Sequence, residues 1–182
     1  METACIECGN SLKLLRKGAK YCSQACKIRA YRRKKRQEQA IPEVMRSRDR
    51  WMRWKLVERN GRQTKIPLRL NGRYGSSTNP DAWCSYRDAR NSEIGNGIGF
   101  ALGEGIGCID LDDCFVDGEL AGWAQEQLDA VDDPLFIEVS QSGNGLHIFC
   151  WMDEKPGRVA AGVETYSTGR FIAMTGNVYE RA

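Results

Sequence analysis

The spacing of polar and apolar residues divides the chain into a polar N-terminal part and a strand-rich remainder. Basic residues dominate between positions 28 and 45, where no strand-like alternation occurs. Ser23 stands where a helix N-cap is expected, and the step from Ile41 to Pro42 disfavours helical backbone. We therefore predict a basic helical arm that continues from Ser23 to about Ala40.

From Arg50 onward the pattern is that of short strands. Residues 50–57 alternate, with Trp51, Arg53 and Lys55 opposite Met52, Trp54 and Leu56. Asn60-Gly61 is typical of a type I′ turn and predicts a return strand over 62–68. Other apolar runs predict strands over 97–102, 107–113, 135–140, 146–151 and 170–175. The strands over 97–102 and 107–113 are expected to be neighbours.

Two further segments have helical patterns. Asn79-Pro80 predicts a helix start, because proline is tolerated in a first turn, and this helix should run to about Arg90. Residues 119–131 place their apolar side chains near one helix face. Many strands and few helices favour an α+β fold with a largely antiparallel sheet over a doubly wound fold.

The net charge of +3 conceals an uneven distribution. Residues 1–75 hold 21 Lys and Arg against 6 Asp and Glu, a net charge of +15, whereas residues 76–182 hold 6 against 18, a net charge of −12. A basic half joined to an acidic half predicts contact with a polyanion at one end and metal-binding carboxylates at the other.

Several protein classes are excluded by absent features. No apolar run reaches the length of a bilayer span and no signal peptide is visible, so we expect a cytoplasmic protein without a membrane partner. The single histidine, His147, excludes HExxH proteases and nucleases with two catalytic histidines. No P-loop motif is present either.

Four cysteines form a cluster near the N-terminus, in the order Cys5-x2-Cys8-x13-Cys22-x3-Cys26. Two short thiol pairs at this spacing suit a tetrahedral, structural zinc site, and Gly9 relieves the crowded turn after Cys8. Two disulfides are the alternative, which a reducing compartment disfavours. The other cysteines, at 84, 108, 114 and 150, are expected to be ordinary thiols.

Two carboxylates stand two positions apart in GCIDLDDC, at Asp110 and Asp112. On a strand they point to the same face, where a cation such as Mg²⁺ or Mn²⁺ would relieve their repulsion. The alternative is a solvated acidic turn after a strand. Glu164 is placed to add a third carboxylate, and Arg170 to reach phosphate oxygens.

The segment SQSGNGLHIFCW joins a glycine-rich turn to a strand. Glycines at 143 and 145 would let backbone amides approach a phosphate, and His147 at the strand start would contact it. The alternative is a structural histidine. Carboxylates, a phosphate cradle and cations together are typical of phosphoryl transfer.

The ordered set GIGFAL, GCIDLDDC, EVSQSGNGLHIFCW and VETYSTGRFIAMTGN resembles the primase-polymerases of the archaeo-eukaryotic primase superfamily, most of all those encoded by phages and plasmids. The resemblance spans roughly residues 48–178. It implies an RRM-like antiparallel catalytic sheet beside a small α/β module. It also implies Asp110 and Asp112 as metal ligands, Gly145-Leu146-His147 as the nucleotide-phosphate motif, and Glu164 as the third acidic residue.

These observations predict three domains: a zinc knuckle or ribbon over 1–27, a basic helix and linker over 28–47, and a catalytic domain over 48–182. The expected activity is DNA-directed nucleotidyl transfer, with nucleoside triphosphates as substrates, single-stranded DNA as template and a separate replicative helicase as partner. Ser142 and Lys65 are expected to contact the nucleotide. The arm is expected to bind nucleic acid through Arg32, Arg33, Lys34, Lys35 and Arg36.

Two alternatives remain open. A metal-dependent nuclease would use the same carboxylates. A zinc-containing DNA-binding accessory protein would need no catalytic metal, and its Asp110 and Asp112 would form an acidic loop.

Overall fold

The computed structural model of the chain describes residues 4–16, 18–59 and 61–181. Contacts divide it into two compact units, Met1–Ala40 and Ile41–Ala182. The predicted zinc module and most of the basic arm therefore share one unit, and residues 41–47 belong to the larger one. In the described part of the chain, no helix is long and apolar enough to cross a bilayer.

The smaller unit contains one long helix, α1 (Gln24–Ala40). The Ser23 hydroxyl accepts a hydrogen bond from the Cys26 N–H at 3.2 Å, as an N-cap does, and the helix ends before Ile41. The prediction of this helix is confirmed.

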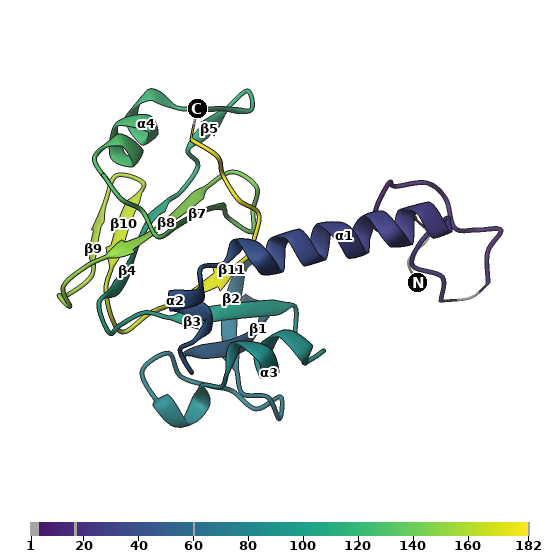
Figure 1. Cartoon of the computed structure of the whole chain (residues 1–182), viewed down its shortest axis with the longest axis horizontal. Helices are drawn as coiled ribbons and strands as arrows, with labels where there is room; N and C mark the ends of the chain where they lie inside the picture. Colours follow the sequence, from purple (N-terminus) through teal and green to yellow (C-terminus); the bar gives the residue numbers. More distant parts are fainter. Residues whose placement is uncertain (1–3, 17, 60, 182) are drawn as a thin grey trace. The chain divides into compact units, whose positions relative to one another are not determined.

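The larger unit opens with a short helix, α2 (Glu43–Arg46), and a four-stranded antiparallel sheet in the order β11-β3-β1-β2 (Figure 1). Its strands are β1 (Trp51–Arg59), β2 (Arg62–Leu68), β3 (Gly97–Ala101) and β11 (Phe171–Met174). Arg59 pairs with Arg62, which confirms the predicted hairpin, although Asn60 of its turn lies outside the described residues. The first four residues of β1 are all buried, so both faces of the strand are covered there.

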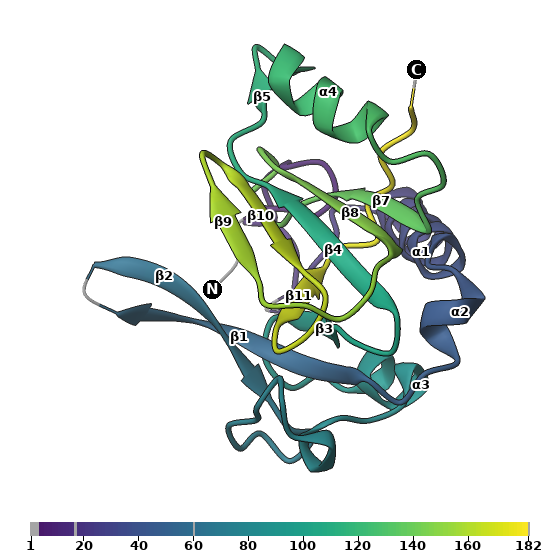
Figure 2. The ribbon, with the colours of Figure 1, turned by 90° about the vertical axis from the view of Figure 1, so that its left-hand side faces the viewer.

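A second antiparallel sheet has the order β7-β8-β4-β10-β9 (Figure 2). Its strands are β4 (Ile106–Leu111), β7 (Phe136–Val139), β8 (Leu146–Trp151), β9 (Arg158–Ala160) and β10 (Val163–Tyr166). Helix α4 (Gly122–Asp129) connects β4 to β7, and β8 lies between these two parallel-running strands, so the three form a split β-α-β unit. The general prediction of an α+β fold with antiparallel sheets is confirmed.

The expectation that the strands near 97–102 and 107–113 are neighbours is wrong. β3 and β4 belong to different sheets. Positive φ angles at Gly103, Glu104 and Gly105 turn the chain sharply between them, with Gly103 and Ile106 bridged across the turn.

Both predicted helices near 79–90 and 119–131 are shorter than expected. The first is divided into a 3₁₀ turn, η1 (Pro80–Ala82), and α3 (Tyr86–Asn91), because Cys84 exchanges backbone hydrogen bonds with Trp51. The second loses its first turn to a small hairpin of β5 (Phe115–Val116) and β6 (Glu119–Leu120). Tertiary pairing overrides local helix propensity at both places.

Candidate functional site

Four polar residues form one line across the five-stranded sheet. Glu138 on β7 pairs with His147 on β8, His147 pairs with Asp110 on β4, and Asp110 pairs with Glu164 on β10. Directly paired residues on adjacent strands project from the same face of a sheet. The structure therefore brings together three predicted site residues and adds Glu138, which the sequence analysis missed.

The opposite face of this sheet is apolar. Leu146 and Ile148 flank His147 in sequence, so their side chains project to the other face. There they belong to a buried cluster with Ala124 and Leu128 of α4. Helix α4 thus covers one face, and the polar line lies on the other.

His147 is held between two carboxylates. Its side chain is almost fully buried, with Nδ1 2.9 Å from Oε1 of Glu138 and Nε2 3.7 Å from Oδ1 of Asp110. The first distance is a hydrogen bond, and the second is an electrostatic contact. The imidazole orientation is therefore fixed from the Glu138 side.

Glu138 is fully buried, and its second oxygen is also engaged. Oε2 accepts hydrogen bonds from the N–H of Thr175 at 3.0 Å and from the N–H of Gly176 at 2.7 Å. The Thr175 hydroxyl lies 3.1 Å from Oε2 and 2.7 Å from the Val139 carbonyl oxygen, so its single proton is shared between them. A buried carboxylate needs such donors. One signal in the sequence was available: an acidic residue interrupts the apolar strand LFIEVS.

Asp110 occupies a half-buried, acidic position, with 21% of its side chain exposed. Burial raises the pKa of Asp110, His147 and Lys65 oppose that rise, and the carboxylates of Asp112 and Glu164 add to it. Lys65 on β2, in the other sheet, is thus within electrostatic range of the site. Accumulated negative charge of this kind is what a bound cation relieves.

The carboxylates are not gathered into a tight cage. Asp112 follows the last residue of β4, is exposed, and donates its N–H to the Gly162 carbonyl at 2.9 Å. Glu164 Oε2 accepts hydrogen bonds from the Tyr166 hydroxyl at 2.8 Å and from Arg170 at 3.1 Å. The Arg170 guanidinium also stacks on the Tyr166 ring, 4.4 Å from its centroid, so Arg170 is held at the site by Glu164 and Tyr166.

The turn between β7 and β8 is closed by its own hydrogen bonds. Ser140 donates its N–H to Gly145, Gly143 donates to Ser140, and Asn144 donates to the Ser142 hydroxyl. These three amides are therefore engaged within the turn. A Cβ at Gly145 would lie 2.6 Å from the Leu111 carbonyl oxygen, so the glycine allows close packing of the turn on β4.

The N-terminal cysteines converge. The sulfur atoms of Cys5, Cys8, Cys22 and Cys26 all lie within 4.8 Å of one another, a group that can hold a structural metal ion such as zinc. Among the described residues, this is the only group in which three or more His, Cys, Asp or Glu ligand atoms come so close together.

Backbone hydrogen bonds place the two thiol pairs. Gly9 adopts a positive φ of 72° and donates its N–H to the Cys5 carbonyl, closing a tight turn around the first pair. The Ile6 N–H bonds to the Lys20 carbonyl and joins this turn to the second pair. Burial raises the pKa of Cys5, but backbone hydrogen bonds involving Cys22, Glu7 and Cys8 outweigh burial and lower the pKa to about 6. The neighbouring thiols of Cys8 and Cys26 raise the pKa of Cys22 to about 12. A bound metal ion would therefore be needed to stabilise all four thiolates together.

The predicted basic residues of α1 do not all have the same surroundings. Arg33 forms an ion pair with Glu7 at 2.9 Å, so it connects the helix to the cysteine turn. Arg32 and Lys35 are exposed, and the side chains of Lys34 and Arg36 lie outside the described part.

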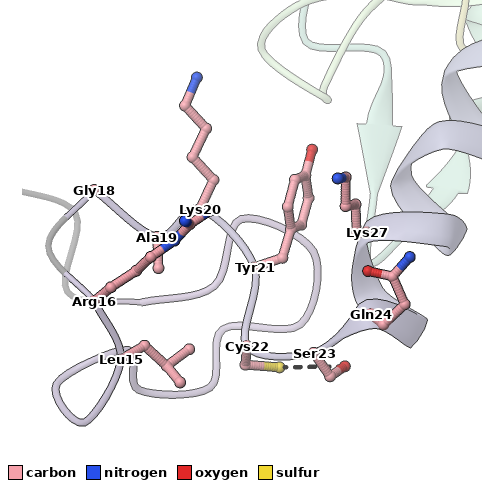
Figure 3. A pocket seen from close by; sticks show the side chains of 10 residues that line it. All are labelled: Leu15, Arg16, Gly18, Ala19, Lys20, Tyr21, Cys22, Ser23, Gln24 and Lys27. Atoms are coloured by element: carbon pink, nitrogen blue, oxygen red, sulfur yellow. Dashed lines mark hydrogen bonds between the residues drawn. The ribbon is translucent and has the colours of Figure 1, made fainter.

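A pocket of about 570 Å³ adjoins the second thiol pair (Figure 3). Arg16, Lys20 and Lys27 contribute three cations to its lining, and none of the described residues that line it is acidic. In the view of Figure 3, the side chains of Lys20, Tyr21 and Lys27 point to the same side. Cations around an aromatic ring suit the phosphates and bases of single-stranded nucleic acid.

A comparison with models of known protein families finds no match to this chain, and a comparison with curated proteins finds none either.

Proposed function

We propose that the chain is a primase-polymerase that adds nucleotides to a strand paired with a single-stranded DNA template. The alignment of Glu164, Asp110 and His147 on one face of one sheet carries the proposal. It brings the acidic and histidine motifs of the sequence resemblance to neighbouring strands, on the face of the sheet opposite α4.

The sheet order supports an RRM-like catalytic sheet. The strands β10, β4, β8 and β7 are adjacent in that order, with α4 connecting β4 to β7. This is the split β-α-β arrangement of ferredoxin-like folds. In this chain, a short hairpin of β9 and β10 takes the place of the second helix of such folds. The first sheet, with α2 and α3, would be the small α/β module.

The acidic residues fit a divalent metal. Asp110, Asp112 and Glu164 offer hard oxygen ligands. Burial raises the pKa of Asp110, and the negative charges of Asp112 and Glu164, which a cation would balance, add to that rise. Mg²⁺ or Mn²⁺ bound there would activate the attacking 3′-hydroxyl and support the leaving pyrophosphate.

The chain's own cations would hold the nucleoside triphosphate. His147 would donate from Nε2 to a phosphate oxygen, because its Nδ1 is already bonded to Glu138. Arg170 and Lys65 would neutralise further phosphate charge, and Ser142 would orient the nucleotide. Gly145 would keep the turn close to β4.

The N-terminal unit would hold the template. Zinc on the four cysteines would order the unit, and the basic pocket with Arg32 and Lys35 of α1 would contact DNA phosphates. A separate replicative helicase in a bacterial host, and a phage or plasmid origin, complete the proposal.

The deciding experiment is extension of a labelled primer on single-stranded DNA with nucleotides and Mg²⁺ or Mn²⁺. We expect the primer to lengthen with the wild-type chain and not with Asp110→Asn combined with Asp112→Asn. Asp132→Asn combined with Asp133→Asn is the matched control, because these paired acids lie outside the site. A shortened primer would support a nuclease instead.

A second experiment asks whether the carboxylates bind metal at all. The chain has one histidine, so His147 gives the only histidine ring signals in an NMR spectrum. Mn²⁺ at the carboxylates would broaden these signals strongly, since Asp110 Oδ1 is 3.7 Å from Nε2. Sharp signals throughout a Mn²⁺ titration, together with no primer extension, would favour the accessory protein.

A further inference from the structure

The second oxygen of Glu138 accepts hydrogen bonds from the backbone N–H groups of Thr175 and Gly176. Backbone N–H groups can only donate, so this oxygen must be an acceptor. A carboxylate accepts hydrogen bonds at both of its oxygens. The other oxygen, 2.9 Å from His147 Nδ1, therefore accepts a hydrogen bond from the ring.

This arrangement decides which ring nitrogen remains available. Nδ1 carries a proton that is committed to Glu138, and Nε2 faces Asp110, whose side chain is partly exposed. The ring is almost fully buried, so it cannot turn without breaking this bond. A carboxylate behind a functional histidine commonly fixes its tautomer and orientation in this way.

We propose that Glu138 is a positioning residue, which keeps Nδ1 of His147 protonated and directs Nε2 toward the bound nucleotide. The nucleotide as ligand rests on the proposed function. The state of the ring does not, because it follows from the hydrogen bonds of Glu138 alone.

Glu138→Gln changes the polarity of this contact without changing its shape. The amide oxygen of the glutamine must take the place of Oε2, since the Thr175 and Gly176 N–H groups can only donate. The glutamine NH₂ group then faces His147 and donates to Nδ1. The ring must respond by leaving Nδ1 unprotonated and placing its proton on Nε2.

Nitrogen-15 labelling of histidine in the full zinc-loaded chain measures this directly, because the single histidine needs no assignment. We expect a protonated Nδ1 in the wild type and an unprotonated Nδ1 in Glu138→Gln. Glu126→Gln, an exposed carboxylate on α4, is the matched control and should leave the spectrum unchanged. An unprotonated Nδ1 in the wild type, or a protonated one in Glu138→Gln, overturns the inference.

Kinetics give a second readout. With nucleotide bound, the wild-type ring donates from both of its nitrogens, whereas in Glu138→Gln it donates from Nε2 alone. The contact with the phosphate is then weaker, so the KM for nucleotide should rise by about tenfold in Glu138→Gln, with a smaller change in kcat. Nitrogen spectra that agree with the inference, in a chain that extends no primer, would refute the proposed function and leave the role of Glu138 intact. Primer extension by a chain whose nitrogen spectra contradict the inference would support the proposed function and refute the role of Glu138.

Two substitutions of His147 test the same hydrogen bond if Glu138→Gln does not fold. The side-chain amide of asparagine can donate near the position of Nδ1 but cannot reach that of Nε2. His147→Asn should therefore retain more stability than His147→Ala in urea unfolding. Equal stability of the two variants would contradict the Nδ1 hydrogen bond to Glu138.

Discussion

Asp110 and His147 face each other across β4 and β8, with Oδ1 and Nε2 3.7 Å apart. The contact brings an acidic and a basic group to one place on a half-buried sheet face, where neither is fully solvated. The two groups attract each other, but burial opposes ionisation of the Asp110 carboxyl group, and functional sites commonly hold such groups at a cost in stability. The pH dependence of folding should reveal that cost.

The first prediction concerns Asp110→Asn in the metal-free site. Burial raises the pKa of Asp110, so the folded chain holds a proton that the unfolded chain releases. The carboxyl group therefore destabilises the fold increasingly as pH rises from the unfolded value of about 3.9 through the higher folded value. We expect Asp110→Asn to be more stable than the wild type at pH 7, with the difference vanishing in acid, in urea unfolding.

Asp133→Asn, at an exposed carboxylate, is the control for this measurement. It should show no gain in stability that depends on pH. A wild type more stable than Asp110→Asn at pH 7 would mean that the contact with His147 outweighs the desolvation of Asp110.

The second prediction concerns the turn before β8. In Gly145→Ala the new Cβ would lie 2.6 Å from the Leu111 carbonyl oxygen and 2.9 Å from the Ser140 hydroxyl. The turn must move away from β4, which should lower the free energy of unfolding by about 2 kcal/mol. Gly122→Ala in α4 is the control, since its Cβ would meet nothing within 4 Å and alanine favours the helix. If the two variants unfold at the same urea concentration, the turn can move away from β4 without loss of stability, and the prediction is wrong.

Local sequence signals predicted much of this site. The alternation around Asp110 and His147 placed both on strands, and the glycine-rich turn before His147 was found as a turn. The cysteine spacing predicted the convergence of the four thiols, because short pairs place sulfurs on single turns. The strand and turn inferences depend on patterns within a few residues, and the convergence of the thiols depends on two such short pairs.

Pairing between distant strands could not be predicted in the same way. Nothing near Gly97–Ala101 reveals that β3 pairs with β1 and β11 rather than with β4. Glu138 was missed for a related reason, since its partners Thr175 and Gly176 are more than thirty residues away in the sequence. Their hydrogen bonds form only when the chain is folded.

The third prediction concerns removal of metal from the N-terminal unit. Its buried core consists of Leu12 and two of the cysteines, Cys5 and Cys26, which is too small to fold alone. Metal binding, on the order of 10 kcal/mol, must supply the missing stability. We expect a strong chelator, or Cys22→Ser, to collapse the NMR signals of residues 4–27 to unfolded positions while those of the Ile41–Ala182 unit persist.

Cys84→Ser is the control for this experiment, because Cys84 lies in the larger unit and remains a free thiol. It should leave the bound zinc, measured by metal analysis, unchanged. Folded signals from residues 4–27 after complete chelation would show that the thiols order themselves without metal.

The fourth prediction concerns the basic pocket beside Cys22. If Lys20 and Lys27 each contact a phosphate of single-stranded DNA, binding releases counterions and weakens with salt. Lys20→Ala combined with Lys27→Ala should then flatten the slope of log affinity against log salt by about 1.4, measured by fluorescence anisotropy. Lys13→Ala removes an exposed charge of the same unit that does not line the pocket, and should change the slope less per charge removed. If the slope changes equally per charge removed in both cases, DNA binding depends only on the net charge of the unit, and the pocket has no role of its own in binding.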